Sequence, residues 1–156
     1  MRKMLLTPLI VCMVVLLPTL SMPTVSAQPM KPLECELELE LLWEPIPHWE
    51  GTITGDIEGT FTQTLIWASF PGFTQHYMET WEIVTADGSF EIYQEGIWSF
   101  KTFKFKSNGW VTDATGTWEY LIGSDAHNRG VTTAFLGPGI PIYSTGTMWL
   151  VGFGPE

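Results

Sequence analysis

Cysteine and positive charge are both scarce in this 156-residue chain. It contains two cysteines, Cys12 and Cys35, and seven basic side chains against seventeen acidic ones. Cys12 lies in an N-terminal segment that we expect to be removed, so the mature protein would have one cysteine and no intramolecular disulfide. The only basic cluster is Lys101, Lys104 and Lys106. The composition therefore excludes nucleic acid as a partner and disfavours anionic membrane surfaces, because both require a positive protein surface.

The first 27 residues have the pattern of an export signal. Arg2 and Lys3 precede an apolar run over residues 4–17, and Val25-Ser26-Ala27 supplies the small residues of a cleavage site before Gln28. Removing the two basic residues changes the formal net charge from −10 to −12, since all acidic residues lie further along. We expect a signal peptide over 1–27 and a single secreted domain over 28–156, without membrane attachment after cleavage. The alternative is an uncleaved N-terminal anchor.

Residues 34–41 alternate strictly between glutamate and an apolar side chain. Glu34, Glu36, Glu38 and Glu40 share one face of the predicted strand, and Cys35 lies on the other face with three leucines. Four ionised carboxylates cannot be buried together, so the glutamate face must meet water. The pattern predicts a solvated acidic row rather than a metal site. It also predicts a buried, unreactive Cys35, with an intermolecular disulfide as the alternative.

Short alternating runs continue to the C-terminus, and no helical periodicity appears after the signal. Turn signals separate these runs near Glu58-Gly59, at residues 86–89 and at Ser107-Asn108-Gly109, and residues 124–129 read as a polar loop. Residues 97–106 and 110–122 read as strands. The pattern predicts an all-β fold with eight or nine strands. We expect a closed or nearly closed antiparallel barrel of about eight strands, with a sandwich as the alternative. Closure is favoured because it removes exposed strand edges.

Three segments carry a resemblance to a known superfamily. They are GWVTDATGTWEY at residues 109–120, STGTMWLVG at 144–152 and the glycine-spaced GTITGDIEGT at 51–60. They resemble the allene oxide cyclase and dirigent-type barrels. The resemblance implies an eight-stranded barrel, often a homo-oligomer, whose apolar cavity shapes a reactive intermediate or binds a small molecule. No catalytic residue of that family is carried over, because no matching catalytic motif is present.

Glu79 is the one acidic residue that shares its strand face with apolar residues. It has the parity of Tyr77, Trp81 and Ile83. If that face points inward, a buried Glu79 would have a raised pKa and would serve as an acid, a base or a polar anchor for a ligand, with Tyr77 as its partner. The favoured interpretation instead places a bulge near Thr80, or Glu79 in water at the barrel mouth, because parity is unreliable near strand ends.

The aromatic residues give the candidate ligand-binding set. Trp110, Trp118 and Tyr120 share one face of a predicted strand, and with Trp81 they are expected to point into the interior. Core packing is the favoured role for most of the tryptophans, and lining a cavity or a sugar-stacking surface is the alternative. Trp43 and Trp49 flank a proline-rich segment and are expected to cover one barrel end.

The histidines and the remaining motifs add no further chemistry. His48, His76 and His127 show no metal-ligand spacing and are interpreted as solvent-exposed, so we expect neither a metal nor a cofactor. No nucleophile elbow or phosphate-binding loop is present.

Three functions remain open at the level of the sequence. The leading one is an exported β-barrel that binds a small apolar or aromatic molecule in its interior. The alternatives are a cyclase- or isomerase-like enzyme that uses Glu79 and Tyr77, and a structural barrel that acts through its surface. An inward Glu79 beside a cavity would favour the enzyme, an apolar cavity would favour the binding protein, and a filled interior would favour the structural role.

Overall fold

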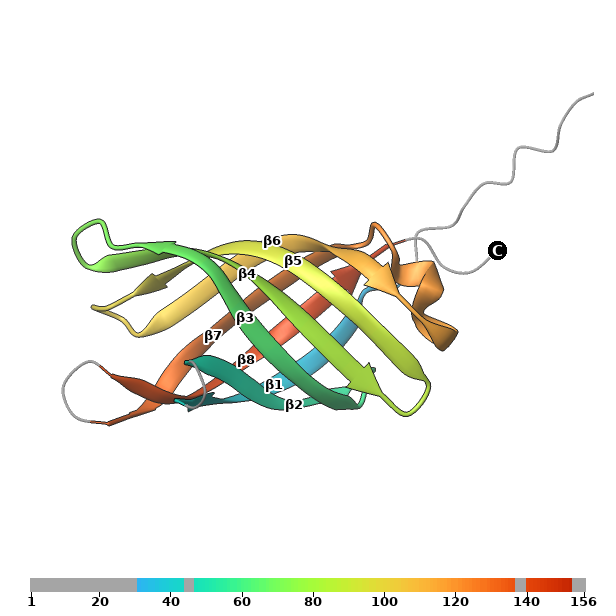
Figure 1. Cartoon of the computed structure of the whole chain (residues 1–156), viewed down its shortest axis with the longest axis horizontal. Helices are drawn as coiled ribbons and strands as arrows, with labels where there is room; N and C mark the ends of the chain where they lie inside the picture. Colours follow the sequence, from blue (N-terminus) through green and yellow to red (C-terminus); the bar gives the residue numbers. More distant parts are fainter. Residues whose placement is uncertain (1–30, 44–46, 137–139, 153–156) are drawn as a thin grey trace, which may run out of the picture.

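The protein is an all-β barrel, as the sequence predicts. The computed structural model describes residues 31–43, 47–136 and 140–152, and the expected signal peptide lies outside this range. Within it, eight antiparallel strands close into one barrel (Figure 1). The strands are β1 (Leu33–Leu42), β2 (His48–Gly55), β3 (Gly59–Ser69), β4 (Thr74–Thr85), β5 (Gly88–Ser99), β6 (Lys104–Ala114), β7 (Asp125–Phe135) and β8 (Pro141–Val151).

Each strand pairs with the next along the chain, and β1 pairs with β8 to complete the ring. The connections therefore alternate between the two ends of the barrel (Figure 1). The β1–β2, β3–β4, β5–β6 and β7–β8 connections lie at one end, which we call the mouth. The β2–β3, β4–β5 and β6–β7 connections lie at the other, which we call the closed end. A 3-10 helix, η1 (Gly116–Leu121), lies in the β6–β7 connection.

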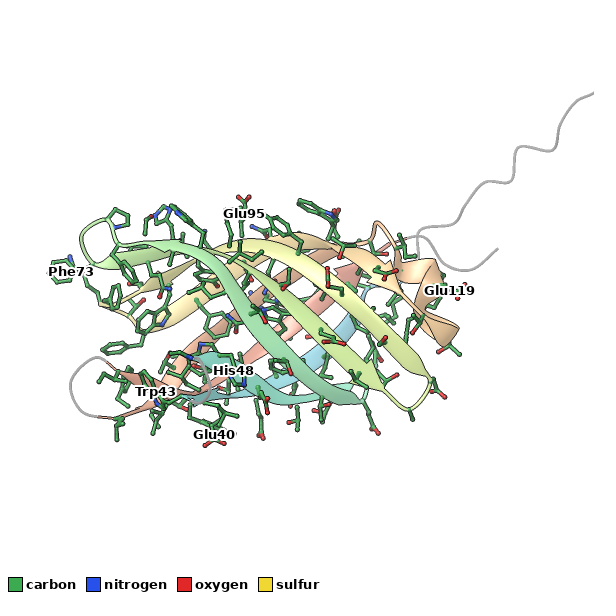
Figure 2. The ribbon with its side chains drawn as sticks, viewed as in Figure 1. Glu40, Trp43, His48, Phe73, Glu95 and Glu119 are labelled. Atoms are coloured by element: carbon green, nitrogen blue, oxygen red, sulfur yellow. The ribbon has the colours of Figure 1, made fainter. Side chains whose placement is uncertain are left out.

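The alternating segment at the start of the domain is strand β1, and its predicted orientation is confirmed. Its four glutamates are exposed, while Cys35, Leu37 and Leu39 are buried. Cys35 is a free thiol, and burial raises its pKa to about 11. Of the glutamates, Glu40 can be seen on the outer surface in Figure 2. The acidic row is thus the outer wall of the barrel, as expected for ionised side chains.

The closed end is filled by apolar side chains. Phe61 and Trp81 stack there with ring centroids 4.5 Å apart, and Leu121 of η1 packs against the same cluster. Such burial of large apolar side chains is the main stabilising contribution in a domain without disulfides. The buried cluster consists of Cys35, Leu37, Leu39, Ile53, Ile57, Phe61, Trp81, Ile83, Phe90, Ile92, Val111, Ala114, Leu121, Ala126, Met148 and Leu150.

Inward-facing glycines make room for aromatic rings nearer the mouth. A Cβ at Gly96 would lie 2.4 Å from the Tyr77 ring, and one at Gly130 would lie 2.4 Å from the Phe105 ring. Each ring therefore lies over the glycine of the neighbouring strand with which its residue is paired, where any larger residue would displace it.

Two predicted connections are in fact strands. Residues 107–109 lie in the middle of β6, and the 124–129 segment, expected to be a loop, is mostly the first half of β7. The β5–β6 turn falls at residues 100–103 instead. The Ser99 carbonyl accepts a hydrogen bond from the Phe103 N–H at 2.7 Å, and Phe103 takes a positive φ of 56°. The side-chain alternation of the predicted 97–106 strand is interrupted between Phe100 and Phe103 by this turn.

The predicted strand over residues 110–122 is also wrong. Strand β6 ends at Ala114, and η1 follows. The break occurs at Gly116, where φ is +65° and a Cβ would lie 2.2 Å from the Asp87 carbonyl oxygen. Only glycine fits both conditions, so the chain turns inward over the closed end. None of the helical structure in the described residues has the length and apolar character needed to cross a membrane.

Candidate functional site

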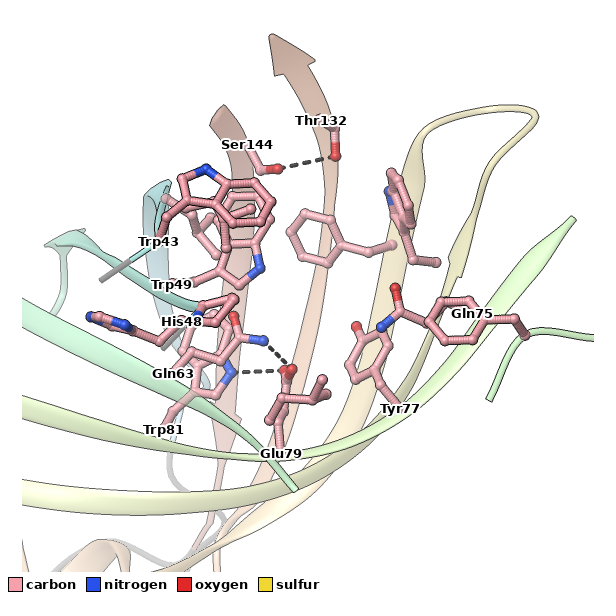
Figure 3. Close-up of a pocket in the computed structure, with 17 residues that line it drawn as sticks. Trp43, His48, Trp49, Gln63, Gln75, Tyr77, Glu79, Trp81, Thr132 and Ser144 are labelled. Atoms are coloured by element: carbon pink, nitrogen blue, oxygen red, sulfur yellow. Dashed lines mark hydrogen bonds between the residues drawn. The ribbon is translucent and has the colours of Figure 1, made fainter. Parts of the chain in front are cut away.

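A cavity of about 380 Å³ opens at the mouth of the barrel (Figure 3). Its walls are mainly aromatic and aliphatic side chains, with polar groups both at the floor and nearer the mouth. The described residues that line it are Leu39, Leu41, Trp43, Pro47, His48, Trp49, Gln63, Leu65, Phe70, Gln75, Tyr77, Glu79, Trp81, Trp98, Phe105, Thr132 and Ser144. The barrel interior is therefore filled at one end and hollow at the other.

Strand β4 places three residues on the cavity side. Tyr77, Glu79 and Trp81 occupy successive inward positions, and all three are buried. Glu79 is only 2% exposed, so the interpretation favoured from the sequence, in which it meets water or follows a bulge, is wrong. The irregularity near this point lies on the partner strand β3, between Leu65 and Trp67. The inward parity of β4 is therefore maintained through Glu79.

The carboxylate of Glu79 accepts three hydrogen bonds from neutral donors. Its Oε1 accepts from the Trp81 Nε1 at 2.8 Å and from the Gln94 Nε2 at 2.6 Å. Its Oε2 accepts from the Gln63 Nε2. Burial raises the pKa of Glu79 to about 7, although the three hydrogen bonds act in the opposite direction. The group can thus change its protonation state near neutral pH.

Glu79 belongs to a polar layer that crosses the interior between the apolar cluster and the cavity. Gln94 is fully buried and links its members. Its Oε1 accepts from the Ser107 hydroxyl at 3.1 Å and from the Asn128 Nδ2 at 2.5 Å. The layer takes its side chains from five consecutive strands, β3 to β7. Two of its members, Gln63 and Glu79, line the cavity and form its polar floor.

Two further polar groups lie in the cavity wall between the floor and the mouth. Tyr77 hydrogen-bonds with Ser107, and burial together with the nearby Glu79 raises the pKa of its phenol. Tyr77 therefore stays protonated at physiological pH. Trp98 is 8% exposed, and its Nε1 has no hydrogen-bond partner in the described part of the protein. An unpaired buried donor costs free energy, and a ligand with an acceptor group would satisfy it.

Apolar side chains also surround the entrance. Trp43 and Trp49 lie over the mouth, as the sequence predicts, and Figure 3 shows both beside His48. Phe73 extends from the tip of the β3–β4 connection (Figure 2), where Lys101 Nζ lies 4.8 Å from its ring centroid. Other exposed apolar residues in the mouth connections are Phe70, Phe103, Leu136 and Ile140.

Three of the four predicted ligand-binding aromatic residues lie away from this cavity. Trp110 is 48% exposed on the outer wall, where its ring centroid lies 4.9 Å from that of Tyr93. Trp118 and Tyr120 belong to η1 and pack against the core at the closed end. Trp118 Nε1 donates to the Thr85 hydroxyl at 2.8 Å. Trp81 alone of the predicted set lines the cavity.

The histidines do not form a metal site among the described residues, where no group of three potential ligand side chains is found. His76 is exposed, as expected, but His48 and His127 are partly buried on strands. His48 Nε2 lies 3.1 Å from the Glu50 carboxylate.

Sequence reasoning missed most of the polar layer. Gln63 and Gln94 have the parity of buried apolar neighbours, Phe61 and Ile92, and that parity could have identified them. Ser107 and Asn128 gave no usable signal, because both lie in segments that were expected to be turns or loops.

No protein-family model matches the chain, and no curated protein or solved structure is significantly similar to it. The resemblance to allene oxide cyclase and dirigent-type barrels therefore stays an expectation from short motifs. Any function must be argued from the geometry of the cavity.

Proposed function

We propose that this protein is an exported β-barrel that binds a small apolar or aromatic molecule in the cavity at its mouth. The observation that carries the proposal is the cavity itself. Its volume of about 380 Å³ falls within the ~300–1,000 Å³ of small-molecule sites. Such sites are typically lined by apolar and aromatic side chains with a small number of oriented polar groups, and this cavity has the same composition. The proposal that the protein is exported depends only on the signal-peptide pattern of residues 1–27.

A proton-transfer enzyme of the cyclase or isomerase type is the second candidate. Glu79 favours it, because a pKa of about 7 suits a general acid or base. Tyr77 would act in such a reaction as a hydrogen-bond donor, since its pKa is raised. Binding is the better-supported function because the oxygens of Glu79 already accept hydrogen bonds from Gln63, Trp81 and Gln94. A general acid or base must gain and lose a proton in each turnover, and a proton on either oxygen would face one of these N–H donors.

The exposed apolar side chains around the mouth support the same proposal. They would let an apolar molecule enter without crossing a charged surface. They also offer a surface for homo-oligomer formation, which the sequence left open.

The test is a cavity-filling substitution with a matched control. Ser144→Phe places a ring in the cavity wall, because Ser144 is buried and lines the cavity. Thr145→Phe places the same ring one residue further along, where the alternation of β8 directs it away from the cavity. Both variants and the wild type are expressed as the full chain and titrated with the neutral fluorescent probe N-phenyl-1-naphthylamine.

We expect the wild type and Thr145→Phe to bind the probe, and Ser144→Phe to bind at least tenfold more weakly. Equal binding by all three folded proteins would locate the probe outside the cavity and contradict the proposal. Native mass spectrometry of the purified wild type adds a direct readout, because a co-purified molecule would appear as a mass increment.

A further inference from the structure

Glu79 combines deep burial with the absence of a nearby cation. Its carboxylate is held by two amide N–H groups and one indole N–H, all of them neutral. Among the described residues that line the cavity there is no lysine or arginine. His48 is the one basic side chain in that set, and its Nε2 lies 3.1 Å from the Glu50 carboxylate. No cation is among the groups that shift the pKa of Glu79.

The hydrogen bonds match the ionised form of Glu79. A carboxylate accepts only, whereas a protonated carboxyl must donate from one oxygen. Oε1 already accepts two N–H groups and Oε2 faces the Gln63 amide nitrogen, so a proton on either oxygen would be directed at a donor. Protonation therefore requires the Gln63 amide to turn over or a hydrogen bond to be lost. The site is built for a negative charge that no described side chain neutralises.

A metal ion is a poor match for this charge. Calcium and magnesium require about six oxygen ligands, and the described cavity residues provide one carboxylate with few other oxygens near it. An organic cation needs fewer polar contacts and gains from aromatic faces. Trp49, Trp81, Trp98, Tyr77 and Phe105 supply such faces around the cavity.

We propose that the molecule bound in the cavity is an aromatic or aliphatic amine, whose protonated nitrogen lies at the floor against Glu79 and whose apolar body fills the aromatic upper part. This inference rests on the proposed binding function and specifies its ligand class. An acceptor atom on the body of the ligand would take the free N–H of Trp98. The protonated amine serves as the counter-ion of Glu79. The charge of the ligand and the burial of its apolar body therefore both favour binding.

Binding of the amine is expected to depend on pH through Glu79. The side chains that donate to its carboxylate are Gln63 on β3, Trp81 on β4 and Gln94 on β5, none of which titrates. The other titratable side chains that line the cavity are Tyr77 and His48. The phenol stays neutral over the pH range used. Amine affinity should therefore rise as Glu79 ionises and level off above pH 7 to 8, since its pKa is about 7.

The experiment compares ligands of equal shape and different charge. Isothermal titration calorimetry of the full-chain protein uses 2-phenylethylamine against 2-phenylethanol, and 2-(1-naphthyl)ethylamine against 2-(1-naphthyl)ethanol. At pH 8 we expect at least one amine to bind at least tenfold more tightly than its alcohol. Glu79→Gln should abolish that preference, whereas Glu82→Gln, on the exposed face of the same strand, should keep it.

The possible outcomes separate this inference from the binding function. If the alcohols bind as tightly as the amines, the amine inference is overturned while the binding function stands. If neither member of either pair binds, and N-phenyl-1-naphthylamine does not bind either, the binding function itself fails. Should Glu79→Gln not fold, the wild type still decides the question. An amine preference that does not fall between pH 8 and pH 5.5 would overturn the role of Glu79.

Discussion

The buried carboxylate of Glu79 makes a prediction about stability that needs no ligand. Its ordinary pKa of 4.5 applies in the unfolded chain, and its pKa in the folded protein is about 7. Between these values the folded state binds more protons than the unfolded state, so stability falls as pH rises. The stabilising contribution is complete below pH 4.5 and is lost through pH 7. At about 1.4 kcal/mol per pH unit, the loss amounts to about 3 kcal/mol.

Glu79→Gln removes this dependence. The glutamine amide has the shape of the protonated carboxyl, and its oxygen can accept from Trp81 and Gln94 as the carboxylate does. We therefore expect the variant to equal the wild type at pH 5 and to exceed it by up to about 3 kcal/mol at pH 8. Urea unfolding followed by tryptophan fluorescence at several pH values measures the difference, with Glu82→Gln as the surface control.

The reasoning is refuted if the stability difference between Glu79→Gln and the wild type stays constant from pH 5 to pH 8. A constant difference would mean that Glu79 has the same pKa in both states. Its burial would then be compensated by groups that the described contacts do not include.

Three other substitutions or treatments test the remaining structure. Gly96→Ala would bring a Cβ within 2.4 Å of the Tyr77 ring, so we expect a loss of about 1–3 kcal/mol in urea unfolding and weaker binding of N-phenyl-1-naphthylamine. Cys35 is buried, and its pKa is raised to about 11. We therefore expect 5,5′-dithiobis(2-nitrobenzoic acid) to label Cys35 at pH 8 only after urea is added. Fast labelling of the native protein would contradict its burial. Trp110→Ser should leave probe binding unchanged and cost less than about 2 kcal/mol, because it removes only an outer contact with Tyr93.

The fold class could be predicted because several strands, β1 above all, follow strict alternation. In β1 every second residue from Glu34 to Glu40 is a glutamate, so the glutamates must face water and the apolar residues between them must face the interior.

Strand β7 lacks such a pattern. Its inward positions near the closed end are Ala126 and Asn128, between the outward Asp125, His127 and Arg129. A small and a polar inward residue give no hydrophobic period, so this strand looked like a loop.

The position of the β5–β6 turn could not be predicted for a different reason. Asn-Gly is a strong turn signal, yet Gly109 is needed within β6 because a Cβ there would lie 1.9 Å from the Tyr93 carbonyl oxygen. The close approach of the neighbouring strand β5 overrode the local preference. Once the turn was misplaced, Trp110 was assigned to the wrong face and Ser107 was removed from the interior. The errors at Trp110 and Ser107 therefore follow from one close contact between β5 and β6.

The division of the interior is an argument for function in its own right. At the closed end this chain fills the barrel with side chains such as Phe61, Trp81 and Leu150, so its scaffold readily accommodates a packed apolar core. Toward the mouth the same strands instead leave a cavity and bury a carboxylate that lowers stability at neutral pH. Folding alone would favour extending the apolar packing, since a buried charge without a partner is costly. A cationic ligand removes both costs together: it fills the cavity and neutralises Glu79. Bound amine should therefore raise the urea midpoint of the wild type more at pH 8 than at pH 5.5, and Glu79→Gln should show no such difference.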